Sequence, residues 1–184
     1  MRKSQIERMN NINKLMKLIG SLDSGFFKTS NGLDMFVERK TTVKYLNRYT
    51  NKVLTIPNND FREIKGFNHG GTLTALVKDF KEFIITGKIT NGKNGYGGLY
   101  CRACGYSIKN MDKIIAFAKE IGYLRPDSES YSSYMIRFYN KNKEWLWDYQ
   151  VEEIEKILGG RIKMRFQLLT TRKEFENLKK VIDY

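Results

Sequence analysis

The spacing of hydrophobic residues along the chain changes from a helical period to a strand-like period and back. Over Ser4–Ile19 the apolar residues Ile12, Met16 and Ile19 recur about one helical turn apart, which predicts an amphipathic helix. Polar residues, Asn13 among them, lie on the opposite side of this predicted helix. We expect the helix to pack on a sheet rather than on a membrane surface.

A region rich in aromatic and β-branched residues follows, a composition typical of strands. Short turn sequences such as Ser30-Asn31-Gly32 separate its segments and indicate hairpins. We therefore expect an antiparallel meander of three or four strands. The expected strands are Phe26–Thr29, Asp34–Arg39, Val43–Tyr49 and Val53–Ile56.

The segment Gly66–Lys88 combines a glycine-rich turn with a second helical pattern. Gly87 is the kind of residue that ends a helix in the left-handed conformation. The turn His69-Gly70-Gly71-Thr72 exposes unpaired N–H groups in a basic neighbourhood, which predicts a site for an anion such as a phosphate or a carboxylate. The apolar stripe of the predicted helix consists of Leu73, Leu76, Val77, Phe80 and Ile84.

The remaining pattern predicts a third helix from about Asn110, its N-cap, to Gly122. A strand, a helix, a strand and a last helix follow, the last opening with the capping box Thr171-Arg172-Lys173-Glu174. The first three are expected at Tyr131–Tyr139, Lys143–Leu158 and Arg161–Leu169, with Gly159-Gly160 ending the middle one. The predicted fold class is α+β: a small antiparallel sheet with packed helices and a C-terminal βαβα portion. We expect a single domain over residues 1–184, with a core of residues 1–128 and an extension of residues 129–184.

Charge is the strongest signal in the composition. The 184 residues include 33 Lys and Arg against 20 Asp and Glu, a net charge of +13, and the excess is concentrated in the first two-thirds. This balance favours a polyanionic partner, although a lysine-rich surface without a specific partner has the same composition. No stretch approaches the ~20 apolar residues of a membrane span, and the N-terminus lacks the apolar core of a signal peptide. We therefore expect a cytoplasmic protein that does not act on membranes.

Two cysteines at CxxC spacing, Cys101 and Cys104, and the single histidine His69 are the candidates for metal or acid–base chemistry. The cysteine pair supplies half of a zinc site, which His69 with a carboxylate or a second chain would complete. A thioredoxin-like redox pair is disfavoured, because such a pair follows a strand, and here a glycine- and tyrosine-rich loop precedes it. Two ordinary cysteines in a turn, and no cofactor, are the favoured interpretation. His69 would act as a general base or an anion ligand, but a turn histidine bonded to backbone is favoured.

Aromatic and cationic residues alternate in the loop Asn91–Tyr106. Rings beside cations suit stacked bases and phosphates, and they suit a protein-binding loop equally well. The predicted binding residues are Lys93, Tyr96, Tyr100 and Arg102 from this loop, with Lys78 and Lys81 from the preceding helix. Lys163 and Arg165, on the outward face of the last predicted strand, form either a second binding patch or an ordinary solvated strand face.

The sequence GFNHGGTLTALVKDFKEFIITGK, preceded by short strands, resembles a family of small accessory proteins in phages and mobile elements of Firmicutes. In that family a GF-[ST]-x-GGTL-x-x-LV motif opens a helix that ends in TG, and a cysteine- or glycine-containing loop and another helix follow. The resemblance covers roughly Gly25–Leu124, with Asn68 at a position where Ser or Thr is expected. Some proteins of this kind resemble type II anti-CRISPR inhibitors, which act on Cas9 and its guide RNA.

The resemblance implies a phage-encoded antagonist of a bacterial defence complex that works in the host cytoplasm by binding rather than by turnover. Its expected partner is the Cas9–guide RNA complex, at a surface where protein meets nucleic acid. Because a protein with a net charge of +13 would not mimic DNA, we expect it to grip the guide RNA, the DNA or an acidic protein face. Two alternatives stay open: a basic DNA- or RNA-binding module without a defence role, and an RNA- or nucleotide-processing enzyme that uses His69.

Overall fold

The structure is a computed structural model that describes residues 1–57, 64, 66–67 and 70–169. The chain divides into two compact units, Met1–Tyr134 and Met135–Tyr184. Helices combine with two small antiparallel sheets, which confirms the α+β class. The helices are α1 (Lys3–Gly20), α2 (Gly71–Thr86), α3 (Ile108–Glu120), α4 (Tyr131–Asn142) and α5 (Asp148–Leu169), with short 3-10 helices η1 (Gly98–Tyr100), η2 (Arg102–Cys104) and η3 (Lys143–Trp145). The strands are β1 (Lys28–Thr29), β2 (Gly32–Leu33), β3 (Met35–Arg39), β4 (Thr42–Asn47) and β5 (Lys52–Leu54).

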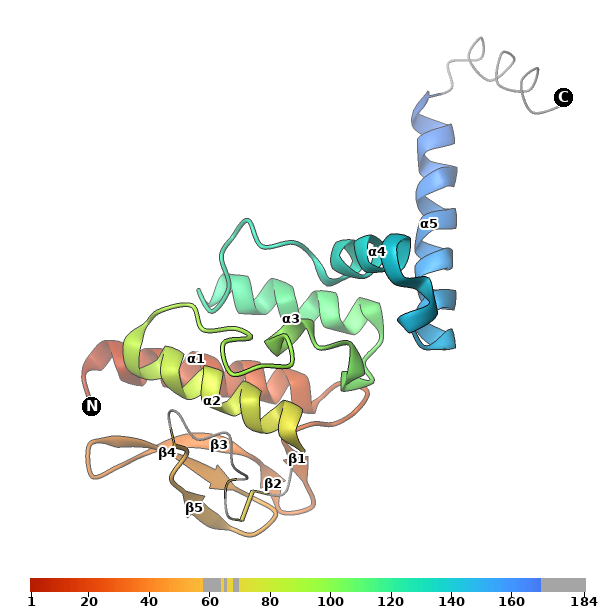
Figure 1. Cartoon of the computed structure of the whole chain (residues 1–184). Helices are drawn as coiled ribbons and strands as arrows, with labels where there is room; N and C mark the ends of the chain where they lie inside the picture. The colour runs from red at the N-terminus through yellow and green to blue at the C-terminus, as the bar shows by residue number, and fades with distance from the viewer. Residues whose placement is uncertain (58–63, 65, 68–69, 170–184) are drawn as a thin grey trace, which may run out of the picture. The chain divides into compact units, whose positions relative to one another are not determined.

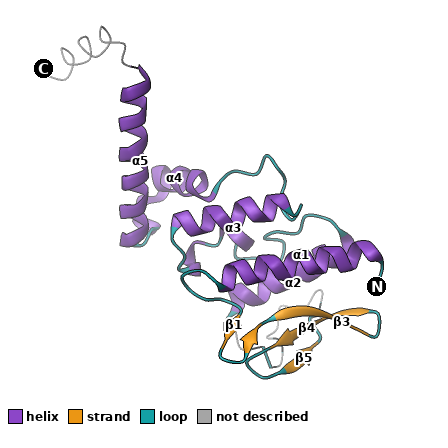
Figure 2. Ribbon diagram, turned by 180° about the vertical axis from the view of Figure 1, so that it is seen from behind, coloured by secondary structure: helices purple, strands orange, loops and turns teal. Residues whose placement is uncertain are grey.

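In the first unit, α1 and α2 lie side by side across a three-stranded sheet, and α3 lies on their other side (Figure 1 and Figure 2). The sheet runs in the order β3-β4-β5 with antiparallel neighbours, and a separate hairpin pairs β1 with β2. The antiparallel meander of three strands is therefore confirmed, and the segment before it forms its own small hairpin.

The first predicted helix is confirmed as α1, and its apolar side is buried. Ile12, Leu15 and Met16 have no exposed surface. Asn13, which we expected on the solvent side, faces β3 instead. Its Oδ1 accepts a hydrogen bond from the Phe36 N–H at 2.7 Å, and its Nδ2 donates to the Phe36 carbonyl at 2.9 Å. Because β3 is an edge strand, these bonds pair backbone groups that the sheet leaves open.

The helix after the glycine-rich turn is confirmed as α2, and every residue of its predicted stripe is buried. Gly87 has a φ of 74°, and its N–H donates to the Phe83 carbonyl at 2.8 Å, so it ends the helix as predicted. Phe80, at the centre of the stripe, has its ring centroid 6.5 Å from that of Phe27 and 5.0 Å from that of Tyr123. The core of the first unit is thus an aromatic cluster under α2.

The two faces of the three-stranded sheet differ in burial. Side chains alternate along each strand, and Phe36 and Tyr45 are buried on the face that meets α1 and α2. On the other face, Met35 pairs across the strands with Leu46, and Leu46 pairs with Val53. These three side chains are partly exposed, Val53 by 41%. The outward face is therefore an accessible surface of mixed character.

The strand predicted at Tyr131–Tyr139 is wrong, because this segment lies in α4. Tyr131, Tyr134, Met135 and Phe138 recur at i, i+3, i+4 and i+7, which is a helical spacing. The many aromatic residues led us to predict a strand. The segment forms a helix because the spacing of its apolar residues lets one face of a helix be buried.

The strand predicted at Arg161–Leu169 is also wrong, because α5 continues through Gly159-Gly160 and includes it. Neither glycine has a positive φ, so the backbone does not stop there. The segment is rich in Arg, Lys, Met, Gln and Leu, which have high helix propensity. Lys163 and Arg165 therefore belong to a helix, and the capping box Thr171–Glu174 lies outside the described residues. No helix in the described ranges, α5 included, is long and apolar enough to cross a membrane.

Two helix starts also differ from the prediction. The N-cap of α3 is Ser107, whose hydroxyl accepts a hydrogen bond from the Asn110 N–H at 3.3 Å. Asn110 lies inside the first turn, and its side chain donates to Asp23 at 2.8 Å. Serine and asparagine are comparable N-caps, so residue type alone does not distinguish Ser107 from Asn110 as the start of the helix. The helix expected at Lys143–Leu158 begins at Asp148, after η3.

Candidate functional site

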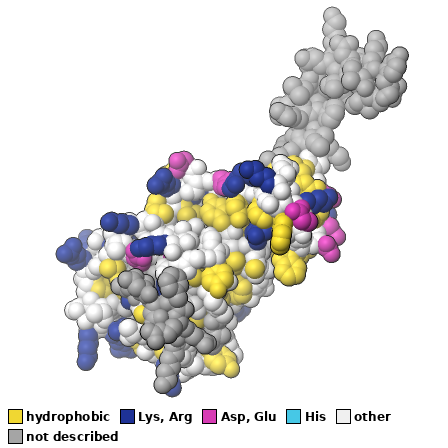
Figure 3. Space-filling model, in the orientation of Figure 1, with side chains coloured by type: hydrophobic (Ala, Val, Ile, Leu, Met, Phe, Trp, Pro, Cys, Tyr) yellow, Lys and Arg dark blue, Asp and Glu magenta, His cyan; other side chains and the backbone are white. Residues whose placement is uncertain are grey.

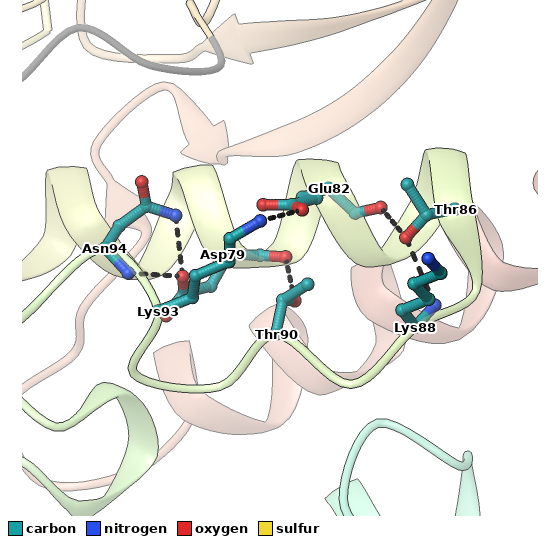
Figure 4. A network of polar contacts seen from close by, with 7 residues as sticks. All are labelled: Asp79, Glu82, Thr86, Lys88, Thr90, Lys93 and Asn94. Carbon is teal, nitrogen blue, oxygen red and sulfur yellow. Dashed lines mark hydrogen bonds and ion pairs between the residues drawn. The ribbon is translucent and has the colours of Figure 1, made fainter.

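The glycine- and tyrosine-rich loop between α2 and α3 is attached to α2 by one buried carboxylate. Asp79 accepts hydrogen bonds from the Gly92 N–H at 2.7 Å, from the Asn94 N–H at 3.0 Å and from Asn94 Nδ2 at 2.7 Å. The Thr90 hydroxyl donates to the Asp79 carbonyl at 2.6 Å. Figure 4 shows these loop residues beside the helix. The loop is therefore hydrogen-bonded to α2 through its own backbone.

Burial raises the pKa of the Asp79 carboxyl above its usual value of 3.8. The hydrogen bonds from Asn94 and Gly92 favour the ionised form and oppose this shift, and repulsion from Glu82 adds to it. The Asp79 carboxylate thus holds the loop by hydrogen bonds, although burial disfavours its negative charge. The hydrogen bonds between the loop and α2 therefore depend on the protonation state of Asp79.

The three lysines predicted for binding around α2 are all engaged in the first unit. Lys78 is only 5% exposed, although its position off the apolar stripe suggested a solvent-facing side chain. Lys93 forms an ion pair with Glu82 (Figure 4). Lys81 is half-buried, and its ammonium group donates to the carbonyl of Ile56. These side chains therefore contribute to the fold as well as to the charge.

The predicted binding tyrosines divide into one exposed and one partly buried residue. Tyr96 is 64% exposed, and its hydroxyl lies 3.0 Å from the position that a Cβ on Gly71 would occupy, at the first turn of α2. The Tyr100 hydroxyl donates to the Glu129 carbonyl at 2.5 Å, and its ring stacks 6.3 Å from that of Tyr131. Burial raises the pKa of Tyr100 to about 12. Tyr96 is thus the ring that the loop presents to solvent.

The predicted anion-binding turn falls partly outside the described residues, because His69 lies there. Gly70 is the N-cap of α2, and Thr72 lies in its first turn. The Thr72 hydroxyl hydrogen-bonds to the Cys101 thiol. The structure therefore brings the start of α2 together with the CxxC pair.

Cys101 and Cys104 flank η2, and their thiols hydrogen-bond to each other. This bond, with smaller contributions from Thr72 and the Arg102 cation, lowers the pKa of Cys101 to about 6. The same bond and burial raise the pKa of Cys104. The described residues contain no group of three or more His, Cys, Asp or Glu side chains placed to hold a metal ion, and a zinc site stays a prediction.

A cationic cluster that our sequence analysis did not single out lies at the β3–β4 hairpin. Arg39 and Lys40 are exposed at its tip. Lys44 lies on the outward face of β4, and its ammonium group donates to the neutral Thr55 hydroxyl at 2.8 Å. Lys81 of α2 lies close enough to Lys44 for the two charges to interact. We refer to Arg39, Lys40, Lys44 and Lys81 as the basic hairpin surface.

The described sheet segment that carries three of these cations holds few carboxylates. Between Met35 and Pro57 the only carboxylate is Glu38, which alternates onto the opposite face and pairs with the N-terminal amine at 2.6 Å. Burial and repulsion from Lys44 lower the pKa of Lys81. Figure 3 shows Lys and Arg side chains standing along the lower left margin, where the sheet lies in this orientation. An anionic ligand would relieve this repulsion.

Part of this surface was available to sequence reasoning. Side chains at a two-residue hairpin turn are normally exposed to solvent. The boundary between the two predicted strands therefore indicated Arg39 and Lys40 as candidate binding residues. Alternation along β4 places Lys44 outward. Lys81 could not be added, because it lies on a helix remote in sequence and only the packing of α2 against β4 brings it near.

The profile of the YoqU family matches residues 2–146. This chain belongs to the YoqU family. The "SPbeta prophage-derived uncharacterized protein YoqU" of Bacillus subtilis (strain 168) is 34% identical over 129 residues, which cover 70% of this chain and 90% of that protein. No solved structure matches the chain. The family match includes the basic hairpin surface, the glycine- and tyrosine-rich loop and the cysteine pair, whereas α5 lies beyond it.

Proposed function

We propose that this chain is a phage-encoded accessory protein that binds nucleic acid through the basic hairpin surface and so blocks a bacterial defence complex. The observation that carries the proposal is the gathering of Arg39, Lys40 and Lys44 on one hairpin, with Lys81 of α2 near Lys44. The prophage origin of its Bacillus subtilis relative supports a phage origin for this chain. The proposed partner is the Cas9–guide RNA complex, in line with the resemblance of the Gly66–Lys88 segment to accessory proteins of that kind.

A phosphate group near Lys44 and Lys81 would remove their mutual repulsion and add charge-assisted hydrogen bonds. The bond from Lys44 to Thr55 has a neutral acceptor, so that bond does not itself neutralise the lysine charge. Arg39 and Lys40, exposed at the tip, are placed to contact further phosphates. If Arg39, Lys40 and Lys44 each neutralise one phosphate, the logarithm of affinity for single-stranded RNA falls with a slope of about −2 against the logarithm of salt concentration.

Apolar and aromatic groups on the same sheet favour single-stranded RNA over a purely electrostatic contact with a duplex. Val53 is 41% exposed on the outward face, and Tyr49, at the turn after β4, is 65% exposed. Exposed rings and apolar side chains beside cations offer platforms on which unpaired bases stack. A guide RNA with unpaired segments presents such bases.

The predicted loop residues have a smaller part in this proposal. Lys93 is paired with Glu82, and Lys78 is almost fully buried, so neither is the first choice for a phosphate contact. Tyr96 and Arg102 stay candidates for a second contact, because both are at least partly exposed in the loop. Lys163 and Arg165 are proposed only as a contribution to the overall positive charge.

The test compares two double charge reversals that change the net charge equally. Arg39→Glu with Lys40→Glu removes the cations of the hairpin tip. Lys109→Glu with Lys113→Glu changes exposed positions of α3 and serves as the matched control. Each variant is checked by far-ultraviolet circular dichroism and then run in size-exclusion co-elution with the Cas9–guide RNA complex, free guide RNA and apo-Cas9, alongside a target-cleavage assay.

We expect the wild type and the α3 control to co-elute with the complex and to inhibit cleavage, and the folded hairpin variant to do neither. Equal losses in both variants would contradict a role for the hairpin, since general charge would then explain binding. Binding to free RNA with cleavage untouched would refute the defence role and leave a nucleic-acid-binding module. RNA degradation that disappears in His69→Ala would favour the enzyme alternative.

A further inference from the structure

The CxxC turn has the geometry of a pair of thiols that can react with each other. Cys101 precedes η2 with an extended backbone and Cys104 is the last residue of η2, so the two cysteines stand at i and i+3 across one short turn. The turn is held at both ends. The Tyr131 hydroxyl donates to the Cys101 carbonyl at 3.3 Å, and the Ser24 hydroxyl donates to the Cys104 carbonyl at 3.1 Å. The backbone at both ends of the turn is therefore held by residues from two other parts of the chain.

The two thiols lie in different surroundings. Cys101 receives hydrogen bonds from the Thr72 hydroxyl, in the first turn of α2, and from the thiol of Cys104. Cys104 instead lines a small apolar cavity with Leu73 and Leu76 of α2 and with other apolar side chains. Donors stabilise a thiolate, whereas apolar surroundings favour a protonated thiol. The asymmetry assigns the two sulfurs different chemical roles.

We propose that Cys101 and Cys104 are a peroxide-reactive dithiol, in which Cys101 attacks and Cys104 resolves. The Cys101 thiolate attacks one peroxide oxygen, the O–O bond breaks, and the departing hydroxide takes up a proton to leave as water. Cys101 is now a sulfenic acid. The Cys104 sulfur attacks the Cys101 sulfur, the S–O bond breaks, and the Cys104 proton leaves with the oxygen as a second water. One hydrogen peroxide and two thiols thus give one disulfide and two waters.

Burial favours peroxide over a bulky oxidant. Cys101 is only 7% exposed, so a large disulfide has poor access to its sulfur, whereas hydrogen peroxide is little larger than water. The pKa of Cys101 near 6 keeps the thiolate available at neutral pH. Its neighbour Cys104 stands ready to capture the sulfenic acid before further oxidation.

The test treats the folded full-length protein with hydrogen peroxide and follows it by mass spectrometry. We expect the wild type to lose two hydrogens and to give a Cys101–Cys104 disulfide in a non-reducing peptide map. Cys104→Ser keeps a hydroxyl donor beside Cys101, so it should accumulate the sulfenic acid, seen as the gain of one oxygen at Cys101, and give a dimedone adduct at Cys101 when the oxidised protein is unfolded in urea with dimedone present. Cys101→Ser should give no comparable adduct at Cys104, because that thiol stays protonated.

A second measurement separates reactivity from simple exposure. In Cys104→Ser, alkylation of Cys101 by iodoacetamide should have a pH midpoint below the value of about 8.5 for a free cysteine, because the Thr72 hydroxyl and the Arg102 cation still favour the thiolate. Thr72→Val, which keeps the shape but removes the donor, should move that midpoint upward. An adduct at Cys104 as fast as that at Cys101, disulfides only between two chains, or a midpoint equal to that of the urea-unfolded protein would each overturn the proposal.

Discussion

Removal of the Asp79 carboxylate should detach the glycine- and tyrosine-rich loop from α2. In Asp79→Ala the loop loses three hydrogen bonds, from the Gly92 N–H and from the backbone and side-chain amides of Asn94. A hydrogen bond to a charged group contributes about 1.5–3 kcal/mol. Because these donors are only part-buried, water replaces some of this contribution, and we expect a loss of about 3 kcal/mol. For a chain of this size the loss corresponds to a fall in Tm of about 6–12 °C.

Asp79→Asn removes the negative charge of the side chain but keeps its shape. The amide keeps one acceptor oxygen, but its NH2 group meets a donor, so we expect a smaller loss of about 1 kcal/mol. The folded-state pKa of Asp79 is raised, so the pH-dependent part of its contribution to stability is fully present below its usual pKa of 3.8 and is lost as the pH rises through the folded value. The stability advantage of the wild type over Asp79→Asn should therefore be larger near pH 3.5 than near pH 7.

The assay must report on the first unit. Both tryptophans, Trp145 and Trp147, lie in the second unit, so intrinsic tryptophan fluorescence would follow the wrong part of the chain. Thermal unfolding by far-ultraviolet circular dichroism gives Tm, and hydrogen exchange of peptides from residues 88–107 shows whether the loop opens. Lys93→Ala, which removes only the exposed pair with Glu82, is the matched control and should change stability by less than about 1 kcal/mol. Unchanged Tm and loop protection in Asp79→Ala would refute the proposed attachment.

Three further substitutions test other parts of the first unit. Thr41→Gly should stabilise the protein by about 1 kcal/mol, because a φ of 62° strains a β-branched residue, and a higher urea midpoint with an unchanged slope would show it. Gly98→Ala should cost about 3 kcal/mol, because a Cβ there would lie 2.3 Å from Asn91 Oδ1 at a φ of 59°, and an unaltered Tm would contradict this. Asn13→Ala should cost about 2 kcal/mol through the loss of both bonds to Phe36, measured as a lower urea midpoint and faster exchange of the Phe36 amide.

Periodicity predicted the first half of the chain well, because one face of each element there is buried. The stripe of α2 and its stop at Gly87 followed from residue spacing and from the left-handed conformation that glycine tolerates. The same approach failed where two patterns competed. The segment Tyr131–Tyr139 has strand-like composition with helical spacing, and Arg161–Leu169 alternates although it continues a helix.

The candidate sites depended on contacts between segments remote in sequence. Lys81 acquires a cationic neighbour only because α2 packs on β4, and Thr72 reaches Cys101 only because the loop folds back to the start of that helix. The sequence by itself determined the α+β class, the helical stripes and the excess of positive charge, since these depend on local spacing and composition. The tertiary structure alone decided which cations are engaged, which are left close together, and which thiol receives hydrogen-bond donors, because each depends on the packing of distant elements.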